Sequence, residues 1–383
     1  MPDVFVVSDN ILSPLGLTTA ENFAQLTKNI TGIKEHNDAN MSASSFYAAL
    51  FDKKNDLIKD SNESIYTKFE QILNASVSNA LENSGIDTSD KKTILIISST
   101  KGNISLLETE TFNSTLQKRI ALHTSAKLVA EYFRFVNQPV VISNACISGL
   151  LAILVGLRLI QSGQYENAVI AGADVISKFV LSGFQSLQAI SDEPCKPFDQ
   201  ARSGISLGEG AGTLILSSRK KYEEGIKIMG GSVNNDANHI SGPSRTGEEL
   251  AGVITKALQE ANISASEIDF ISAHGTATLY NDEMEANAIT IAGLQSVPVN
   301  SLKGYYGHTL GAAGLIESII SIHSLKENLV LPTMGFKQPG VTKPLNICSA
   351  LLHGPFQNCL KTASGFGGCN AAIVYGRSGN MLN

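Results

Sequence analysis

The chain has 383 residues, of which 43% are hydrophobic and 17% charged, with 33 glycines and no tryptophan. This composition is typical of a folded protein with a large core and excludes a disordered one, and the length fits two or three domains or one large duplicated fold. The formal net charge of −6 offers no basic surface for nucleic acid, so we expect no nucleic-acid partner.

Targeting and redox signals point to the cytoplasm. The longest apolar stretch, from Gly149 to Ile160, contains Arg158 and falls short of the roughly 20 residues that a membrane span needs. The first residues lack the basic start and the small-residue cleavage site of a signal peptide. The five cysteines are odd in number and show no C-x-x-C spacing, so neither a disulfide framework nor a structural zinc site is expected.

Apolar runs bounded by turn residues alternate with helical patterns along the first half. Buried strands are predicted, in chain order, over Val4–Val7, Thr93–Ser98, Pro139–Ser143, Ala168–Ala171 and Thr213–Ser217. Helices are predicted between them over Thr19–Asn29, Ile65–Asn83 and Ser148–Gln161. The most polar segment, Asp52–Glu63, is interpreted as a solvated surface insertion.

The second half repeats this alternation. Strands are predicted over Ile226–Met229, Phe270–Ala273, Pro298–Ser301 and Ala371–Tyr375, and helices over Glu248–Ala261, Asp282–Ala292 and Gly311–Lys326. The order predicts an α/β fold in layers, with mostly buried sheets and two comparable halves, 1–218 and 219–383. A site at the seam would draw residues from both halves.

Cys146 stands where a β-branched strand passes directly into an apolar helix. This strand–turn–helix junction resembles the elbow that presents a nucleophile in other folds. The partial positive charge of a helix N-terminus is also a known route to a lowered thiol pKa. The sequence alone leaves two readings open, a nucleophilic thiol and a packed core cysteine at a tight turn.

Two histidines follow predicted strands and have glycine neighbours. His274 begins the run His-Gly-Thr-Ala-Thr, and His308 precedes the run Thr-Leu-Gly-Ala-Ala-Gly. A histidine beside glycine is commonly a hydrogen-bonded turn residue, but two at strand ends beside a cysteine elbow favour a Cys-His-His site. Without an H-x-x-x-H pattern or a carboxylate cluster, we predict no metal.

Charged and glycine-rich segments flank these histidines. Lys303 precedes His308, and Glu285 and Glu317 lie on the helices that follow the two histidine loops. These three residues are either ordinary surface charges or partners that stay ionised in an apolar centre. Residues 206–212 lack a phosphate-loop pattern, whereas the turn 364–370 is either plain turn geometry or a source of backbone N–H groups near a reacting centre.

Together these blocks resemble the elongating β-ketoacyl-[acyl-carrier-protein] synthases of the thiolase superfamily. The matching motifs occur in family order over nearly the whole chain: Ala145-Cys146-x-Ser148-Gly149, Lys196-Pro197-Phe198-Asp199-x-x-Arg202, Gly208-Glu209-Gly210-Ala211-Gly212, His274-Gly275-Thr276-x-Thr278 with Asn281-Asp282, Lys303 to His308 to Gly314, and Gly365-Phe366-Gly367-Gly368-x-Asn370. The resemblance implies a thiolase-like αβαβα fold of two similar halves.

The resemblance also implies roles for single residues. Cys146 would carry the acyl chain, and His274 and His308 would bind the thioester carbonyl while a malonyl thioester loses carbon dioxide. The backbone N–H groups of Cys146 and Phe366 would form the oxyanion hole. The supporting charges would be those of Lys303, Glu285 and Glu317. The substrate-binding residues would be Thr276, Thr278, Ser364 and Gly367.

The implied partners are an acyl carrier protein and a second subunit, in a homodimer or a heterodimer with a related ketosynthase-like chain. No resident cofactor is implied, because the substrates arrive on the phosphopantetheine of the carrier protein.

Departures from the family pattern keep several alternatives open. Ser364 replaces a phenylalanine that the family commonly has, and Tyr305 and Tyr306 are candidates to fill its space. The pathway is either fatty-acid elongation or polyene and other specialised-metabolite assembly. The alternatives to a condensing enzyme are a chain-length-type partner subunit, which characteristically lacks the nucleophile, and a degradative thiolase, for which Cys369 would have to be a second catalytic cysteine.

Overall fold

A computed structural model describes residues 1–52, 65–82, 84–236, 238–240 and 242–378. The first half contributes five strands to the central sheet: β1 (Val4–Leu12), β4 (Thr93–Ser98), β5 (Val140–Ile142), β6 (Asn167–Asp174) and β8 (Gly210–Ser217). They run in the order β5-β4-β6-β8-β1, with β5, β4 and β6 parallel and β8 antiparallel to both of its neighbours. Every residue of β4, β6 and β8 is buried, which explains their continuous apolar runs.

The second half repeats this sheet. Its strands are β9 (Ile226–Asn235), β10 (Phe270–Ser272), β11 (Val299–Asn300), β14 (Asn358–Gly365) and β15 (Cys369–Arg377). Their order, β11-β10-β14-β15-β9, and their parallel and antiparallel pairings match those of the first half strand for strand. A short β1–β9 pairing, Val4 with Ile228 and Phe5 with Lys227, joins the two sheets at their first strands. The repeated topology confirms the expected fold of two similar halves, while the boundary at residue 218 stays a prediction.

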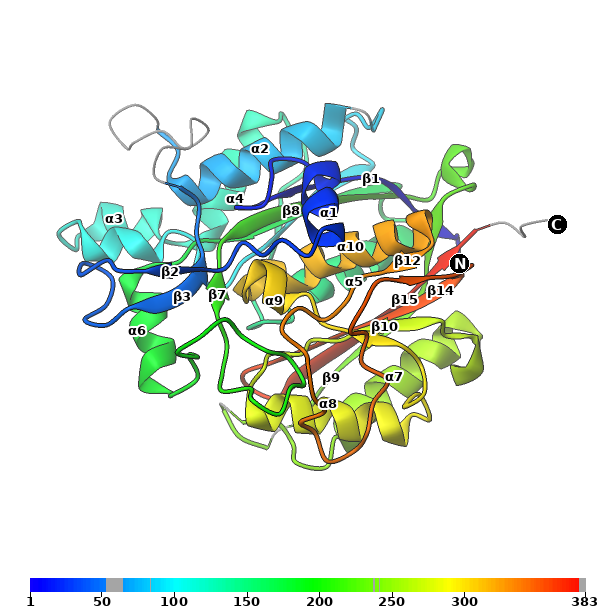
Figure 1. The fold of residues 1–383 in the computed structure, drawn as a ribbon. Helices are drawn as coiled ribbons and strands as arrows, with labels where there is room; N and C mark the ends of the chain where they lie inside the picture. The colour runs from blue at the N-terminus through cyan, green and yellow to red at the C-terminus, as the bar shows by residue number, and fades with distance from the viewer. Residues whose placement is uncertain (53–64, 83, 237, 241, 379–383) are drawn as a thin grey trace.

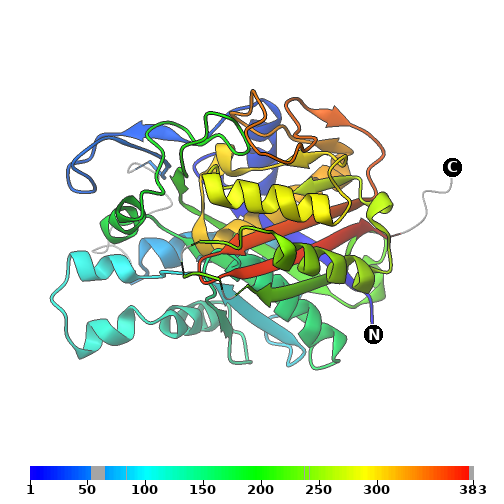
Figure 2. The ribbon, with the colours of Figure 1, turned by 90° about the horizontal axis from the view of Figure 1, so that it is seen from below.

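Helices make three layers around these sheets (Figures 1 and 2). Helices α5 (Ser148–Gln161) and α10 (Ala313–Glu327) lie between the sheets and share the central hydrophobic core. Helices α2 (Lys68–Glu82) and α4 (Leu122–Tyr132) cover the outer face of the first sheet, and α7 (Glu248–Ala261) and α8 (Leu279–Ile291) cover that of the second. This is the expected αβαβα arrangement.

The two central helices touch at one glycine each. A Cβ atom on Gly149 would lie 2.6 Å from the backbone nitrogen of Leu315, and one on Gly314 would lie 2.8 Å from that of Leu150. Since real Cβ contacts are longer than this, glycine at both positions is what lets the backbones approach so closely. The crossing fixes the start of each helix, and with it the turns that precede them, relative to the other half.

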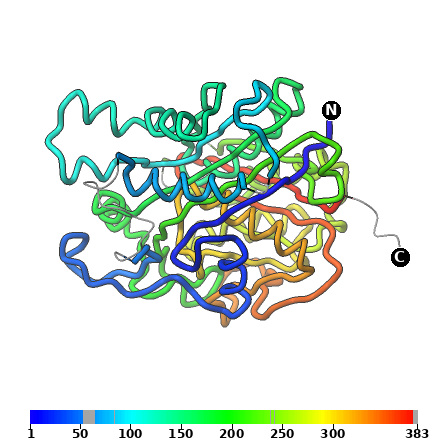
Figure 3. The backbone as a smooth tube through the Cα atoms, turned by 90° about the horizontal axis from the view of Figure 1, so that it is seen from above, coloured from blue at the N-terminus to red at the C-terminus, as the bar shows by residue number. Residues whose placement is uncertain are grey.

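Shorter elements surround this framework. The helices are α1 (Thr19–Thr27), α3 (Ser114–Arg119), α6 (Lys178–Ser186) and α9 (Lys303–Tyr306), with 3₁₀ turns at Ile104–Glu108, Lys220–Tyr222, Ala265–Glu267 and Leu310–Ala312. The strands are β2 (Lys34–His36), β3 (Phe46–Ala49), β7 (Leu207–Gly208), β12 (Leu329–Val330) and β13 (Leu352–His353). Figure 3 shows the segment around α3 extending away from the layered body.

The sequence predictions agree with most of the framework. The strand predicted over Thr93–Ser98 and the helices predicted over Ser148–Gln161 and Glu248–Ala261 have the observed bounds, and the other predicted elements differ mainly at their ends. Strand β14 was not predicted, because its polar residues Lys361 and Thr362 interrupt the apolar pattern. Apart from Asp52, the insertion predicted over Asp52–Glu63 lies outside the described residues. Within the described part of the chain, no helix has the length and apolarity needed to cross a membrane.

Candidate active site

Cys146 lies in a strained turn between β5 and α5. Ala145 has a φ of 44°, a left-handed value that few side chains adopt without cost. Ser148, the first residue of α5, holds the turn together: its hydroxyl accepts a hydrogen bond from the Asn144 N–H and donates one to the Ala145 carbonyl, both at 2.7 Å. The predicted elbow is therefore present, and it points the Cys146 side chain into a cavity.

His274 comes two residues after β10 in the second sheet. A single carboxylate, that of Glu285 on α8, accepts hydrogen bonds from the backbone N–H groups of His274 at 2.8 Å and Gly275 at 2.6 Å. The same carboxylate also accepts from Asn281 and from the Thr362 hydroxyl on β14. Glu285 thus fixes the backbone that presents His274.

His308 occupies the corresponding turn before α10. Its backbone N–H donates to the Ser206 carbonyl at 2.7 Å, and its ring Nδ1 lies 3.2 Å from the Leu310 N–H. Because a backbone N–H can only donate, Nδ1 is the acceptor and the ring proton lies on Nε2. His308 therefore presents an N–H donor to the cavity.

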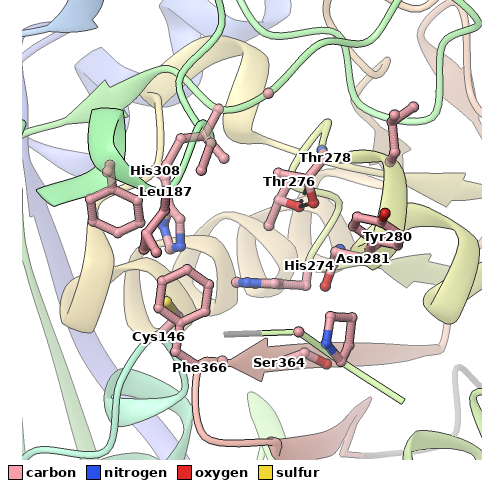
Figure 4. A pocket seen from close by; sticks show the side chains of 18 of the residues that line it. Cys146, Leu187, His274, Thr276, Thr278, Tyr280, Asn281, His308, Ser364 and Phe366 are labelled. Atoms are coloured by element: carbon pink, nitrogen blue, oxygen red, sulfur yellow. Dashed lines mark hydrogen bonds between the residues drawn. The ribbon is translucent and has the colours of Figure 1, made fainter. Parts of the chain in front are cut away.

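The side chains of Cys146, His274 and His308 meet at the cavity floor. Their sulfur and nitrogen atoms lie within 4.8 Å of one another, and the imidazole centroids are 5.3 Å apart at 82°. Figure 4 shows both rings pointing into the space beside Cys146 and Phe366. These donor types also suit zinc, so the absence of a resident metal stays a prediction.

Burial and neighbouring cations keep both imidazoles neutral. The pKa of His274 lies well below 6.5, first because of burial and then because of Lys303, His308 and Lys361. The pKa of His308 is lowered by burial, Lys303 and Lys361. The Lys303 ammonium lies 3.2 Å from His274 Nδ1 and can only donate to it, which leaves the His274 proton on Nε2. Both rings can donate to one oxygen atom placed between them.

The expected lowering of the Cys146 pKa is wrong. Burial raises the pKa of this thiol to about 12, although Lys303 and a hydrogen bond from the Phe366 N–H both favour the thiolate. Desolvation is the largest cause, because the side chain is only 8% exposed. The resting site therefore holds a thiol.

The predicted supporting charges are buried behind the histidines. Lys303 donates to the His274 carbonyl at 2.7 Å and to Glu317 at 2.6 Å, and both Lys303 and Glu317 are nearly inaccessible. Glu285 binds backbone instead of a lysine. None of the three lines the cavity, so they act on it through His274.

Two buried ionisable residues of this region, Lys361 and Asp174, were not predicted from the sequence. Lys361 on β14 is fully buried and lies 2.7 Å from the second carboxylate oxygen of Glu317. Asp174, at the end of β6, accepts from the backbone N–H groups of Thr100 and Gly311, which ties the first half to the His308 turn. A lysine inside the run Cys-Leu-Lys-Thr-Ala, next to the glycine-rich turn, was the available signal for Lys361.

The cavity above the three side chains has a volume of about 440 Å³. Thr276 and Thr278 line its wall, and their hydroxyls are hydrogen-bonded to each other at 2.9 Å. Ser364 lines it beside Cys146, with its hydroxyl donating to the Asn370 side chain at 2.8 Å. Gly367, predicted to bind substrate, does not line the cavity; its N–H donates to the Ile240 carbonyl on the far side of the loop.

Aromatic packing at Ser364 differs from the expectation. Tyr305 and Tyr306 are both buried, but neither lines the cavity, and the Tyr305 hydroxyl donates to Asn29 instead. The ring that accompanies Phe366 is Phe184 of α6, with centroids 5.8 Å apart. A ring from a helix of the first half therefore lines the same cavity as Ser364.

Cys369 lies outside the cavity. It is buried beneath the glycine-rich turn, where its thiol donates to the Phe366 carbonyl at 3.4 Å, and burial raises its pKa to about 11. A degradative thiolase mechanism would need this thiol at the reacting centre, so the structure disfavours that alternative.

Known proteins match this chain along its length. The model of the β-ketoacyl synthase N-terminal domain matches residues 1–222, and that of the C-terminal domain matches residues 226–337. The chain is 30% identical to the 3-oxoacyl-[acyl-carrier-protein] synthase 2 of Vibrio cholerae, over 98% of this chain and 99% of that one.

Solved structures agree. The ishigamide ketosynthase/chain length factor superposes with a TM-score of 0.89 at 25% identity, over 99% of this chain and all of that one. A ketosynthase of Xenorhabdus doucetiae, solved with its chain length factor, gives 0.87 at 24% identity over 98% of both chains. With the domain matches and the Cys-His-His geometry, these likenesses show that the chain belongs to the β-ketoacyl synthase family of condensing acyltransferases.

Proposed function

We propose that this protein condenses an acyl group held on Cys146 with a malonyl group held on an acyl carrier protein. The observation that carries the proposal is the meeting of the thiol with two N–H-donating imidazoles within 4.8 Å at the floor of one cavity. One half supplies a nucleophile, and the other supplies donors for an oxygen that becomes negatively charged.

In the first step, the Cys146 sulfur attacks the carbonyl of an acyl thioester. The new C–S bond forms as the carrier thiolate leaves, and the thiol proton goes to that leaving group. The negative oxygen of the intermediate would be stabilised by backbone N–H groups, for which those of Cys146 and Phe366 are the candidates. Because burial raises the pKa of the resting thiol, its proton has to be lost during acyl transfer.

In the second step, the malonyl thioester loses carbon dioxide. The electrons of the broken C–C bond pass into an enolate, whose oxygen accepts hydrogen bonds from His274 and His308. The enolate carbon then attacks the acyl carbonyl on Cys146, and the C–S bond breaks. The product leaves as a β-ketoacyl thioester, and the Cys146 thiolate takes up a proton from water to restore the thiol. Each neutral imidazole can donate a hydrogen bond to this oxygen through its Nε2–H group.

The partners are also proposals. A phosphopantetheine arm of a carrier protein would enter along Thr276 and Thr278, so no resident cofactor is needed. A second subunit, either identical or a related ketosynthase-like chain, would complete a dimer. The presence of Cys146 and both histidines favours the catalytic role over that of a chain-length partner.

Product detection tests the proposal. The purified protein, alone and with candidate partner chains, is incubated with an acyl-carrier protein and malonyl-carrier protein, and the carrier-bound products are measured by mass spectrometry. We expect a β-ketoacyl product two carbons longer than the acyl donor. If malonyl-carrier protein is never decarboxylated by any combination, the proposed function is wrong.

A further inference from the structure

Lys361 occupies a position where a charge is costly. It lies on β14 with no exposed surface, and its ammonium group donates to the carbonyls of Ser272, Ala273 and Thr362 at 2.8–3.2 Å. A buried ammonium is retained only where hydrogen bonds and an opposite charge compensate its lost hydration. Here three carbonyls and the Glu317 carboxylate do so.

Lys361 and Lys303 share one acid. Glu317 places one carboxylate oxygen 2.6 Å from Lys303 and the other 2.7 Å from Lys361. The Lys303 ammonium group also contacts the ring of His274. The Lys361 ammonium group donates hydrogen bonds to the carbonyls of Ser272 and Ala273, the two residues before His274. Lys303 therefore holds the ring and the carbonyl of His274, and Lys361 holds the two residues before it.

The buried lysines and glutamates nearest to His274 are equal in number. The ionisable groups that surround the pair come from both halves: Cys146, Asp174, Asp282, Glu285, Lys303, Glu317 and Lys361. Asp282 faces Arg202 at 3.9 Å, Asp174 is held by backbone N–H groups, and Cys146 is a neutral thiol. Nearest to His274, Lys303 and Lys361 stand against Glu285 and Glu317, while burial raises the pKa of the Asp174 carboxyl, which has no cation beside it among the described residues. Loss of Lys361 would leave one uncompensated negative charge beside the histidines.

We propose that Lys361 is a positioning residue for this site: its ammonium group fixes the strand end that carries His274 and balances the buried carboxylates, so that both imidazoles remain neutral N–H donors. The lysine reaches no substrate, since it does not line the cavity. It acts through Glu317 and the His274 backbone. The consequence for catalysis rests on the proposed function, whereas the consequence for the imidazoles does not.

The test is the titration of the histidine rings. Nitrogen-detected NMR of ¹⁵N-histidine protein follows protonation of His274 and His308, assigned with single His→Gln variants, and decarboxylation of malonyl-carrier protein is measured over the same pH range. In Lys361→Met the midpoint of imidazole protonation should rise by about one pH unit or more, since a nearby cation has been removed. The acid limb of decarboxylation should move upward with it. Lys227→Met, which removes a surface lysine of β9, should leave both unchanged.

Two further variants test the same charge argument if Lys361→Met does not fold. Glu317→Gln leaves an excess of one positive charge, and Lys361→Met/Glu317→Gln restores the balance. The expected order of midpoints is Glu317→Gln lowest, the double variant higher, and Lys361→Met highest. Equal midpoints in Glu317→Gln and the double variant, or an unmoved midpoint in folded Lys361→Met, overturn the proposal. If the midpoints move as expected but malonyl-carrier protein is not decarboxylated by the parent, the proposed function fails and the role of Lys361 stands.

Discussion

The turns that precede α5 and α10 occupy the same place in the two halves, yet they are built differently. The first turn, 143–147, carries only uncharged side chains and depends on the strained Ala145 and on Ser148 to point Cys146 inward. The second turn, 303–310, contains Lys303 and stands against Glu317. One half therefore presents a reactive atom through backbone shape, and the other presents one through a buried ionic network.

This difference matches what each atom has to do. The buried thiol in this uncharged turn is held as a neutral group, because burial raises its pKa to about 12. The imidazoles have to present fixed N–H donors, so their ring nitrogens are held by Lys303 and by the Leu310 N–H. The repeated fold provides two equivalent turns, and the residues around each turn determine whether it presents a thiol or an imidazole N–H donor.

The largest effect should come from removing the thiol. Cys146→Ala should abolish β-ketoacyl product, because no other side chain in the cavity can hold the acyl group as a thioester, while the fold remains intact. Product formation is measured by mass spectrometry and folding by circular dichroism. Cys369→Ala is the matched control and should keep activity within a few-fold. Full condensation by a verified Cys146→Ala protein would contradict the assignment of the nucleophile.

The next largest effect should come from the two histidines of the second half, and it should fall on one of the two chemical steps. His274→Ala and His308→Ala should each slow decarboxylation by about 10²–10³-fold, the typical cost of losing one donor to a developing oxyanion. Acyl transfer to Cys146 should be affected less, since that step uses the first turn. The exposed His353 provides a control in His353→Ala. Decarboxylation at the parental rate in either variant would remove that histidine from the mechanism.

Sequence reasoning located the reacting atoms and, through the family resemblance, three of the charged residues that hold them (Lys303, Glu285 and Glu317), but not Lys361. Cys146, His274 and His308 are visible because each stands at an abrupt change from a strand pattern to glycine or helix. Lys361 was missed because its partners Glu317 and Ser272 are distant in the chain and meet it only when β10, β14 and α10 assemble. The helix argument for Cys146 gave the wrong pKa direction, because burial cannot be read from a single turn.

Substitutions at the crossing of α5 and α10 should lower the stability of the fold more than they change the chemistry. Gly149→Ala and Gly314→Ala would each place a methyl group against the backbone of the other helix, 2.6 and 2.8 Å from the nearest nitrogen. Overpacking of this kind costs about 1–3 kcal/mol, measured as the free energy of unfolding in urea. Gly252→Ala on α7 is the control, because a Cβ there meets open space. Parental stability in both crossing variants would show that the two turns are not fixed by this contact.

The smallest effect is expected at Ser364. Replacing it with phenylalanine adds a ring to the cavity wall beside Cys146 and removes the hydrogen bond to Asn370. Ser364→Phe should shift the preferred acyl donor while malonyl decarboxylation continues, and Ser364→Ala should keep the parental preference. Competition among acyl-carrier proteins of different chain length measures this. An unchanged profile in Ser364→Phe would mean that this position does not contact the acyl chain.

The division of roles between the two halves is tested most directly by the intact mass of the protein after incubation with acyl-carrier protein alone. The parent, His274→Ala and His308→Ala should all gain one acyl group, and peptide mapping should place it on Cys146; Cys146→Ala should gain none. An adduct that forms equally in Cys146→Ala, or that requires either histidine, would contradict the account.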